Sequence, residues 1–339
     1  MDAKSKQQQV VTENTSILNI IHYLEKSELG AIKTLMRKEM KPQILCLIYL
    51  KDISPTYLIG GSTDKTIKVW DIMRDTCLKT LSGHTQQVNC LLQLKEVDIY
   101  QIISGSEDTT IKVWDLKSQE YFKCVKTLNF HSDAVNSITN FPDYDKNIIA
   151  SGGSDKNIKI INVVTGECNK TLTAHTGPVF CLLNLKQASG CLLSTGEDKS
   201  LRIWNIETEV CLKTKIGHTD IVLDLILVDN ETLATCGLDT TIVLWRLNPF
   251  EIKKTLTSHT NTVRCLLSLN DAYKGIMLSA SEDLTVKTWN TISNNGECIS
   301  TLKFKEFTVN CFAFLKDYGK HDIATGNTNG TIQLMKFKN

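Results

Sequence analysis

The residues of this chain that could perform acid–base chemistry are histidines and aspartates, and they recur along it. A histidine next to a carboxylate is the pair that general acid–base catalysis uses. Here a histidine precedes five of the aspartates by a little more than twenty residues, and successive aspartates are 41 to 47 residues apart. A pair that recurs with such a period occupies a structural position, so we predict no catalytic residue. The recurring acids are Asp64, Asp108, Asp155, Asp198, Asp239 and Asp283, with Asn329 at the corresponding place of a seventh copy.

Each of these aspartates lies in a short turn between two strand-like segments. In residues 103–115 an apolar segment is followed by the polar run Ser-Glu-Asp-Thr-Thr and then by a second apolar segment that ends at Trp114. Nearly the same sequence occurs at residues 60–70, 194–204 and 279–289. A period in the low forties with strand signals throughout is typical of a β-propeller built from four-stranded blades.

The end of each unit is as regular as its turn. Gly-His-Thr occurs at residues 83–85 and 217–219, and the third strand ends in Trp-Asp at residues 70–71 and 114–115. In these motifs the chain resembles the WD-repeat family, over about 300 of its 339 residues. The resemblance implies an all-β fold: a seven-bladed propeller of four-stranded antiparallel blades.

The resemblance also implies a hydrogen-bonded tetrad inside a blade: a histidine before the first strand, a serine or threonine on the second, the turn aspartate, and the tryptophan on the third. A buried histidine needs partners for both ring nitrogens, and these residue types provide them, so the tetrads are structural. The full sets are His84, Ser104, Asp108 and Trp114; His175, Ser194, Asp198 and Trp204; His218, Thr235, Asp239 and Trp245; and His259, Ser279, Asp283 and Trp289.

Three copies depart from this pattern. The third has Ile161 in the tryptophan position, and the first has Gly60 in the serine position with no histidine ahead of it. The seventh has Lys305, Asn329 and Met335 in the histidine, aspartate and tryptophan positions. We therefore expect the seam between blades seven and one to be the softest part of the ring.

The two ends of the chain are predicted to close the ring. The sequence ends after a third strand, so blade seven lacks an outer strand, and residues 31–36 resemble the outer strands at 77–81 and 251–256. We predict that residues 31–36 supply the missing strand, which removes an exposed sheet edge. The propeller then comprises residues 31–339.

Residues 1–30 are predicted to form a polar tail followed by a short amphipathic helix. Apolar residues recur at helical spacing from Ile17 to Leu24, and the Gly at position 30 marks an end. This helix would either pack on the propeller or bind a partner.

Composition limits the remaining functions. The formal charge is +1, which gives no support for binding nucleic acid, and no apolar run approaches the length of a membrane span. Ten of the twelve cysteines fall at two repeated strand positions, and no Cys-x-x-Cys pair occurs. We therefore predict no metal or cofactor, and a reducing compartment, the cytoplasm or the nucleus.

Binding is expected on the top face, where the loops vary while the strands stay regular. By the family resemblance, the residues beside the first strand's opening position and just before the turn aspartate point there. Blades four to six would present an apolar patch with charged neighbours, although Ile221 and Leu223 could instead pack between blades. The predicted partner-binding residues are Phe180, Ile221, Leu223, Leu238, Arg264, Glu197 and Glu282.

The function predicted from these features is a scaffold or adaptor that binds one or more proteins within a multiprotein complex, and not an enzyme. No phosphate-binding loop, metal-ligand spacing or nucleophile elbow is present. One alternative is the substrate-recognition subunit of a ubiquitin ligase, because residues 114–117 resemble a Trp-Asp-x-Arg/Lys docking pattern. A G-protein β-like protein or a ribosome-associated WD-repeat protein are further alternatives.

Overall fold

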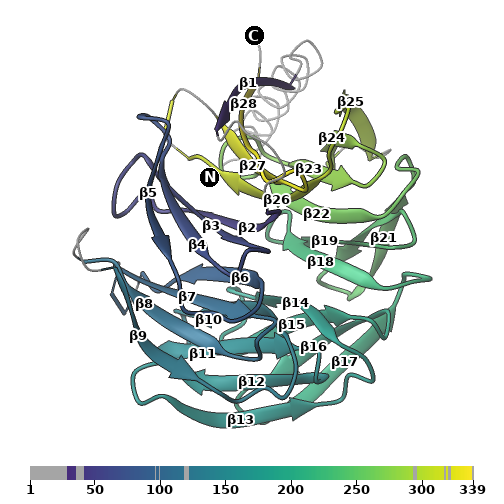
Figure 1. Ribbon diagram of the computed structural model, residues 1–339. Coiled ribbons are helices and arrows are strands. Elements are labelled where there is room, and N and C mark those ends of the chain that lie inside the picture. The colour runs from purple at the N-terminus through teal and green to yellow at the C-terminus, as the bar shows by residue number, and fades with distance from the viewer. Residues whose placement is uncertain are drawn as a thin grey trace, which may run out of the picture.

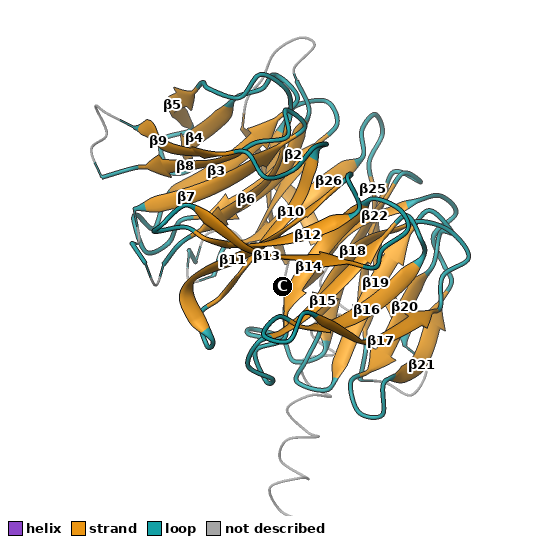
Figure 2. Cartoon of the chain, turned by 90° about the horizontal axis from the view of Figure 1, so that it is seen from below, coloured by secondary structure: helices purple, strands orange, loops and turns teal. Residues whose placement is uncertain are grey.

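The computed structural model describes residues 29–35, 42–95, 97–98, 100–117, 122–292, 296–316, 318–319 and 322–337. Every regular element in these residues is a β-strand, as Figure 2 shows. The helix predicted between Ile17 and Leu24 lies outside the described residues.

The 28 strands form seven four-stranded sheets whose neighbouring strands are antiparallel, so the predicted seven-bladed propeller is confirmed. Blade one contains β2 (Ile44–Tyr49), β3 (Tyr57–Ser62), β4 (Ile67–Asp71) and β5 (Thr76–Leu81). Blade two contains β6 (Val88–Gln93), β7 (Gln101–Ser106), β8 (Ile111–Asp115) and β9 (Lys123–Leu128). Blade three contains β10 (Val135–Phe141), β11 (Asp145–Gly153), β12 (Asn157–Asn162) and β13 (Glu167–Thr173). Blade four contains β14 (Val179–Asn184), β15 (Cys191–Gly196), β16 (Ser200–Asn205) and β17 (Val210–Ile216). Blade five contains β18 (Val222–Leu227), β19 (Thr232–Gly237), β20 (Ile242–Arg246) and β21 (Glu251–Leu256). Blade six contains β22 (Val263–Ser268), β23 (Ile276–Ser281), β24 (Thr285–Asn290) and β25 (Glu297–Lys303).

Blade seven is built from both ends of the described chain. It contains β26 (Val309–Phe314), β27 (Ile323–Asn327), β28 (Ile332–Phe337) and, as its outer strand, β1 (Leu29–Leu35). β1 pairs with β28 in antiparallel register, from Leu29 opposite Phe337 to Leu35 opposite Ile332. Figure 1 shows the purple β1 beside the yellow β28. The predicted closing strand is therefore confirmed, and it begins at Leu29 rather than at position 31.

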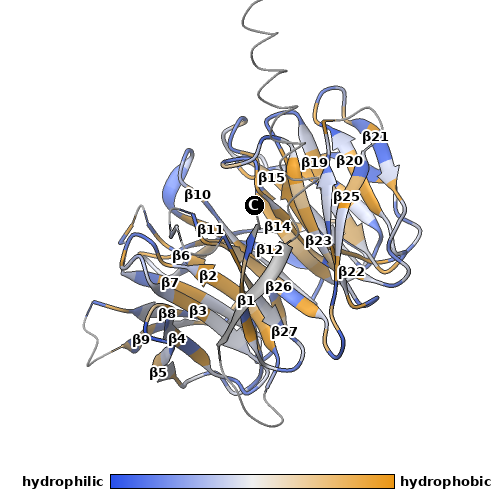
Figure 3. Ribbon diagram, turned by 90° about the horizontal axis from the view of Figure 1, so that it is seen from above, coloured by the Kyte–Doolittle hydropathy of each residue, from blue (hydrophilic) through white to orange (hydrophobic). Residues whose placement is uncertain are grey.

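The hydrophobic core is divided among the junctions between blades. Seven clusters of buried residues occur, and each draws on two neighbouring blades. For example, Ile59 of blade one packs with Val88 and Trp114 of blade two, and Ala324 and Leu334 of blade seven share a cluster with blade one. Figure 3 shows apolar colouring along the inner strands and polar colouring on many loops. Apolar burial thus holds each blade to its neighbours.

The first strand of every blade is innermost and carries a bulge after its first residue, as between Val88 and Cys90. Hydrogen bonds also connect these inner strands across blades. The N–H of Leu182 donates to Oγ of Ser137 at 3.1 Å, and the N–H of Leu266 donates to Oδ2 of Asp224 at 2.7 Å. Ser137 and Asp224 occupy the position that is cysteine in the other five blades.

Candidate functional site

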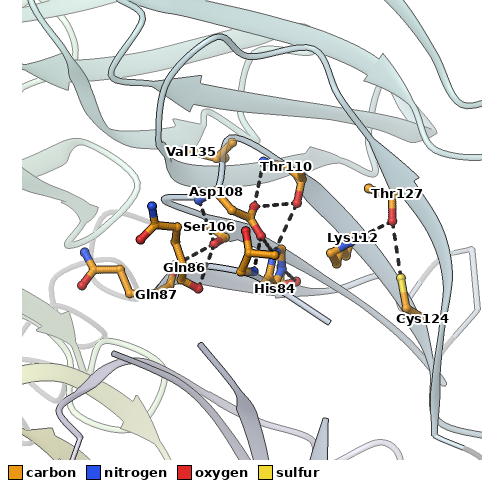
Figure 4. A network of polar contacts seen from close by, with 12 residues as sticks. His84, Gln86, Gln87, Ser106, Asp108, Thr110, Lys112, Cys124, Thr127 and Val135 are labelled. Carbon is orange, nitrogen blue, oxygen red and sulfur yellow. Dashed lines mark hydrogen bonds and ion pairs between the residues drawn. The ribbon is translucent and has the colours of Figure 1, made fainter. Parts of the chain in front are cut away.

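Blade two has a complete tetrad, and Figure 4 shows its His84 and Asp108 together with Thr110. His84 contacts Oδ2 of Asp108 through Nδ1 at 2.8 Å and Oγ of Ser104 through Nε2 at 2.6 Å. The indole N–H of Trp114 donates to the same Ser104 oxygen at 2.8 Å. Asp108 also accepts hydrogen bonds from both N–H and Oγ1 of Thr110, which fixes the turn between β7 and β8. One polar network therefore joins the turn to the second and third strands and to His84, which lies between β5 and β6.

The same network recurs in blades four, five and six. In each of them the histidine side chain is at most 1 % exposed. The His–Asp and His–hydroxyl distances are 2.8 and 2.6 Å for His175 with Asp198 and Ser194, 2.9 and 2.8 Å for His218 with Asp239 and Thr235, and 2.7 and 2.7 Å for His259 with Asp283 and Ser279. The indoles of Trp204, Trp245 and Trp289 donate to the same hydroxyls at 2.7 to 2.8 Å.

The electrostatics of the tetrads fit a structural role. Burial alone would raise the pKa of Asp108, but hydrogen bonds from Thr110, Thr85 and His84 outweigh it and lower that pKa to about 2. Burial lowers the pKa of His84 below its ordinary value, although Asp108 opposes this shift. The histidine is buried and both its nitrogens are engaged, so it has no site at which to exchange a proton with a ligand.

The departing blades keep the turn but lose parts of the network. In blade one Lys68 forms an ion pair with Asp64, whereas in blades two to six a histidine contacts the turn aspartate. The Trp70 indole is 2 % exposed, and its N–H has no acceptor among the described residues. In blade seven Asn329 accepts hydrogen bonds from N–H and Oγ1 of Thr331, so the turn survives there without an aspartate.

The predicted partner-binding residues lie on three consecutive blades. Glu197, Leu238 and Glu282 directly follow the second strand of their blades, and Ile221 directly precedes β18. These positions lie at the face that carries the turn aspartates, which we call the top face. The apolar members are half-buried, and none belongs to the seven core clusters of the described residues. The set is Phe180 and Glu197 on blade four, Ile221, Leu223 and Leu238 on blade five, and Arg264 and Glu282 on blade six.

Backbone contacts hold parts of this surface in place. The N–H of Leu238 donates to the carbonyl of Ile221 at 2.9 Å, so these two residues are adjacent. A Cβ at Gly237 would lie 1.9 Å from that carbonyl, so only glycine allows this approach. Arg264 and Glu282 form a 2.5 Å ion pair with side chains 41 % and 30 % exposed, and Glu197 is exposed. The charged residues thus remain accessible beside the apolar ones.

The opposite face, which we call the bottom face, is hollowed around the ends of the first strands. Two hollows of about 460 and 470 Å³ share Lys186 and Phe314 in their linings. No pattern in the sequence predicts them, because their walls combine strand ends and loops of several blades. They are the second feature of the surface that could bind a partner.

The structure also describes the remaining motifs of the sequence. Lys117 of the docking pattern is 58 % exposed and forms a 2.6 Å ion pair with Asp98. The twelve cysteines carry free thiols. Within the described ranges no three His, Cys, Asp or Glu side chains are grouped as a metal site would need. The same ranges contain no helix of the length and apolar character that a membrane crossing demands.

The comparisons with known proteins agree with this geometry. The family profile WD40, described as "WD domain, G-beta repeat", matches residues 43–71, 75–115, 122–162, 166–205, 209–246 and 250–290. Its matches do not include the seventh blade, which lacks the tetrad histidine, aspartate and tryptophan.

Two coatomer subunits of Arabidopsis thaliana, beta'-1 and beta'-2, are each 46 % identical to this chain over 43 residues. That segment is 13 % of this chain and only 5 % of the length of those relatives, about the length of one repeat. WD40 propellers are generally non-enzymatic and bind other proteins. On the family match and the seven blades, the chain belongs to the WD40 family of β-propellers.

Proposed function

We propose that this propeller is a protein-interaction scaffold that holds a partner segment on its top face at blades four to six. The observation that carries this proposal is the position of Phe180, Ile221, Leu223 and Leu238. These side chains are half-buried at the surface and lie outside every core cluster of the described residues. Apolar side chains that the fold does not use internally are available to a partner.

The neighbouring charges suit a peptide or protein partner. Apolar anchors surrounded by a polar rim are the usual composition of an interface hot spot. Here the rim contains Glu197 and the exposed pair Arg264–Glu282. Because both signs of charge are present, the rim favours a partner segment with an apolar side chain flanked by polar or charged residues.

A role within a larger complex is part of the same proposal. The two relatives are named as subunits of a coatomer, and this chain resembles them over about one repeat. We propose a reducing compartment, the cytoplasm or the nucleus, because the twelve cysteines are free thiols. The ubiquitin-ligase alternative rests on the resemblance of residues 114–117 to a docking pattern.

The experiment is affinity capture from an extract of the source cells, with bound proteins identified by mass. The bait is the wild-type chain or the double variant Phe180→Ala/Leu238→Ala. The matched control is Val210→Ala/Leu212→Ala on the outer strand β17, where both side chains are about half exposed. Loss of two anchors is expected to weaken binding of a top-face partner about thirtyfold.

The proposal is supported if the double variant loses a partner that the control retains while both variants keep the wild-type melting temperature. If the double variant captures the same proteins in the same amounts, these side chains are not a binding site.

A further inference from the structure

The bottom face has a second built surface where the first strands end. Tyr49, Gln93, Leu227 and Phe314 are the last residues of β2, β6, β18 and β26, and Asn140 is next to last in β10. Because the first strands are innermost, their ends surround the lower mouth of the ring. This mouth is on the opposite side of the propeller from the patch of Phe180 and Leu238.

Two hollows lie side by side at this mouth, since they share Lys186 and Phe314. The first has a volume of about 460 Å³, and Ile48, Leu92 and Asn140 also line it. The second has about 470 Å³, with Leu227 on its wall. In an extended peptide, alternate side chains project to the same side. Two adjacent hollows with a common wall therefore fit alternate residues of one extended segment better than one compact molecule.

In the first hollow one cation has no ion-pair partner among the described residues, because Asp229 and Asp271 line only the second hollow. Lys95 is paired with Asp52, and Lys316 is paired with Asp271 at 2.9 Å. Lys186 is exposed and has no ion pair or side-chain hydrogen bond with any described residue. Because Lys186 borders both hollows, its ammonium group lies where a bound segment would pass. It offers a contact for a carboxylate.

A polar group inside the first hollow is also unused. The side-chain amide of Asn140 is half-buried and forms no hydrogen bond within the described part of the chain. An amide can both donate to and accept from a peptide backbone. The residues at the same strand position in blades five and seven are the large apolar Leu227 and Phe314. The mouth therefore has one polar and one apolar side.

We propose that the lower mouth binds an extended segment of a partner protein in which a bulky apolar residue stands next to an aspartate or glutamate. The apolar side chain enters the first hollow against Phe314 and Leu92. The carboxylate contacts Lys186, and the backbone of the segment contacts Asn140. This site is separate from the top face, so the propeller can hold two partners at once.

The test uses the full-length chain on an array of immobilised octapeptides. Each peptide carries one Phe, Leu or Trp beside Asp, Glu or Lys in a Gly-Ser background. The key variant is Lys186→Glu, because an exposed side chain can be reversed in charge without disturbing the core. Its matched control is Lys215→Glu, which reverses an exposed lysine on the outer strand β17.

The wild type and Lys215→Glu are expected to retain the Asp and Glu peptides over the Lys peptides. Lys186→Glu should bind the best acidic peptide about tenfold more weakly, measured by fluorescence anisotropy, and should shift its preference toward lysine. Asn140→Ala should weaken all retained peptides without changing the charge preference.

Three results would overturn the proposal. One is no retention of any apolar-acidic peptide above the Gly-Ser background. Another is unchanged acidic preference in Lys186→Glu. The third is loss of binding in Phe180→Ala/Leu238→Ala, which would move the peptide to the top face and leave that proposal standing instead.

Discussion

Blades two and one bury a tryptophan in the same position with different polar surroundings. In blade two the Trp114 indole donates to Ser104, which also contacts His84. In blade one Gly60 replaces the serine, and the Trp70 indole has no acceptor among the described residues. Both rings are 2 % exposed. The indole is therefore kept for its packing, and the hydrogen-bond network is an addition.

Magnitudes explain why blade one tolerates the loss. An unsatisfied buried donor costs about 1–3 kcal/mol, whereas removing a large aromatic side chain from a core costs about 3–5 kcal/mol. Trp70 remains favourable without its hydrogen bond because it packs with Ile44 and Leu58 of its own blade and with Ala324 across the seam. The seam is thus held mainly by apolar contact, whereas each of blades two to six has a His–Asp hydrogen bond in addition to its apolar contacts.

The largest effect on the seam is expected from removal of the closing strand β1. Deletion of residues 1–37 takes away β1 and exposes the edge of β28, so blade seven loses a quarter of its sheet. We expect aggregation or loss of the cooperative melting transition, measured by size-exclusion chromatography and calorimetry. The control is deletion of residues 1–28, which retains β1. A soluble monomer with the wild-type melting temperature after the longer deletion would refute the role of β1.

The next largest effect is expected from Ser104→Ala in blade two. This change leaves both Nε2 of His84 and the indole N–H of Trp114 without their partner inside the core. The cost in free energy of unfolding should be about 2–4 kcal/mol, measured by denaturant titration. Its control is Ser258→Ala, an exposed serine between β21 and β22, for which a change below about 0.5 kcal/mol is expected. If Ser104→Ala and its control both change the free energy of unfolding by less than about 0.5 kcal/mol, the network does not contribute to stability.

Acid should reduce the difference in stability between blades that have a His–Asp pair and blades that have none. The pKa of Asp108 is held at about 2 and that of Asp239 also at about 2, below the ordinary value of 3.8. Burial lowers the pKa of His84 below 6.5. For both residue types the unfolded chain takes up protons first as the pH falls. Their stabilisation is therefore complete above pH 6.5, declines below it for the histidine, and is lost from about pH 4 toward pH 2 for the aspartates.

Hydrogen exchange resolved by blade measures this difference. At pH 7 we expect amides of β2 and β28 at the seam to exchange faster than those of β7 and β15. At pH 4, corrected for the intrinsic exchange rate, blades two and six should lose more protection than blade seven, which has no His–Asp pair. Uniform protection at pH 7 would contradict the softer seam.

The smallest effect is expected from Thr325→Val in blade seven. The Thr325 hydroxyl is in the serine position, is fully buried, and has no hydrogen-bond partner among the described residues. Replacing it by a methyl group of similar size should leave the free energy of unfolding unchanged or raise it by less than about 1 kcal/mol. A loss comparable to that of Ser104→Ala would show that the hydroxyl has a partner in solution.

The sequence was sufficient for the fold because the fold is repeated. Seven turns at a regular period, alternating apolar strands and an outer-strand motif near position 31 predicted the blades and their closure. Local patterns of this kind are preserved in each copy, so each copy supports the others. The predicted tetrad residues could likewise be placed by register, and the structure brings each set together within hydrogen-bond distance.

Features that depend on contacts between blades could not be predicted. In the sequence, Phe250 follows Asn248-Pro249 in a tight turn, and nothing in the repeat pattern explains an apolar residue there. In the structure it is 3 % exposed, stacks on Trp245 at 6.0 Å between ring centroids, and lies below the Lys213 ammonium. Outer strands elsewhere bury a leucine, such as Leu81, where β17 has Lys215. Phe250 therefore fills space that a neighbouring blade leaves, which no single repeat can reveal.

The position of the core between blades separates the unit that duplicates from the unit that folds. A gene can multiply a segment of about forty residues, yet one such segment has no interior of its own. Its histidine follows the outer strand of one blade and completes the tetrad of the next. His84, for example, comes after β5 of blade one and contacts Ser104 on β7 of blade two. Gaining or losing a single repeat would change the angle at every junction at once. The number of blades is therefore fixed by the whole ring, while individual blades remain free to exchange their surface residues.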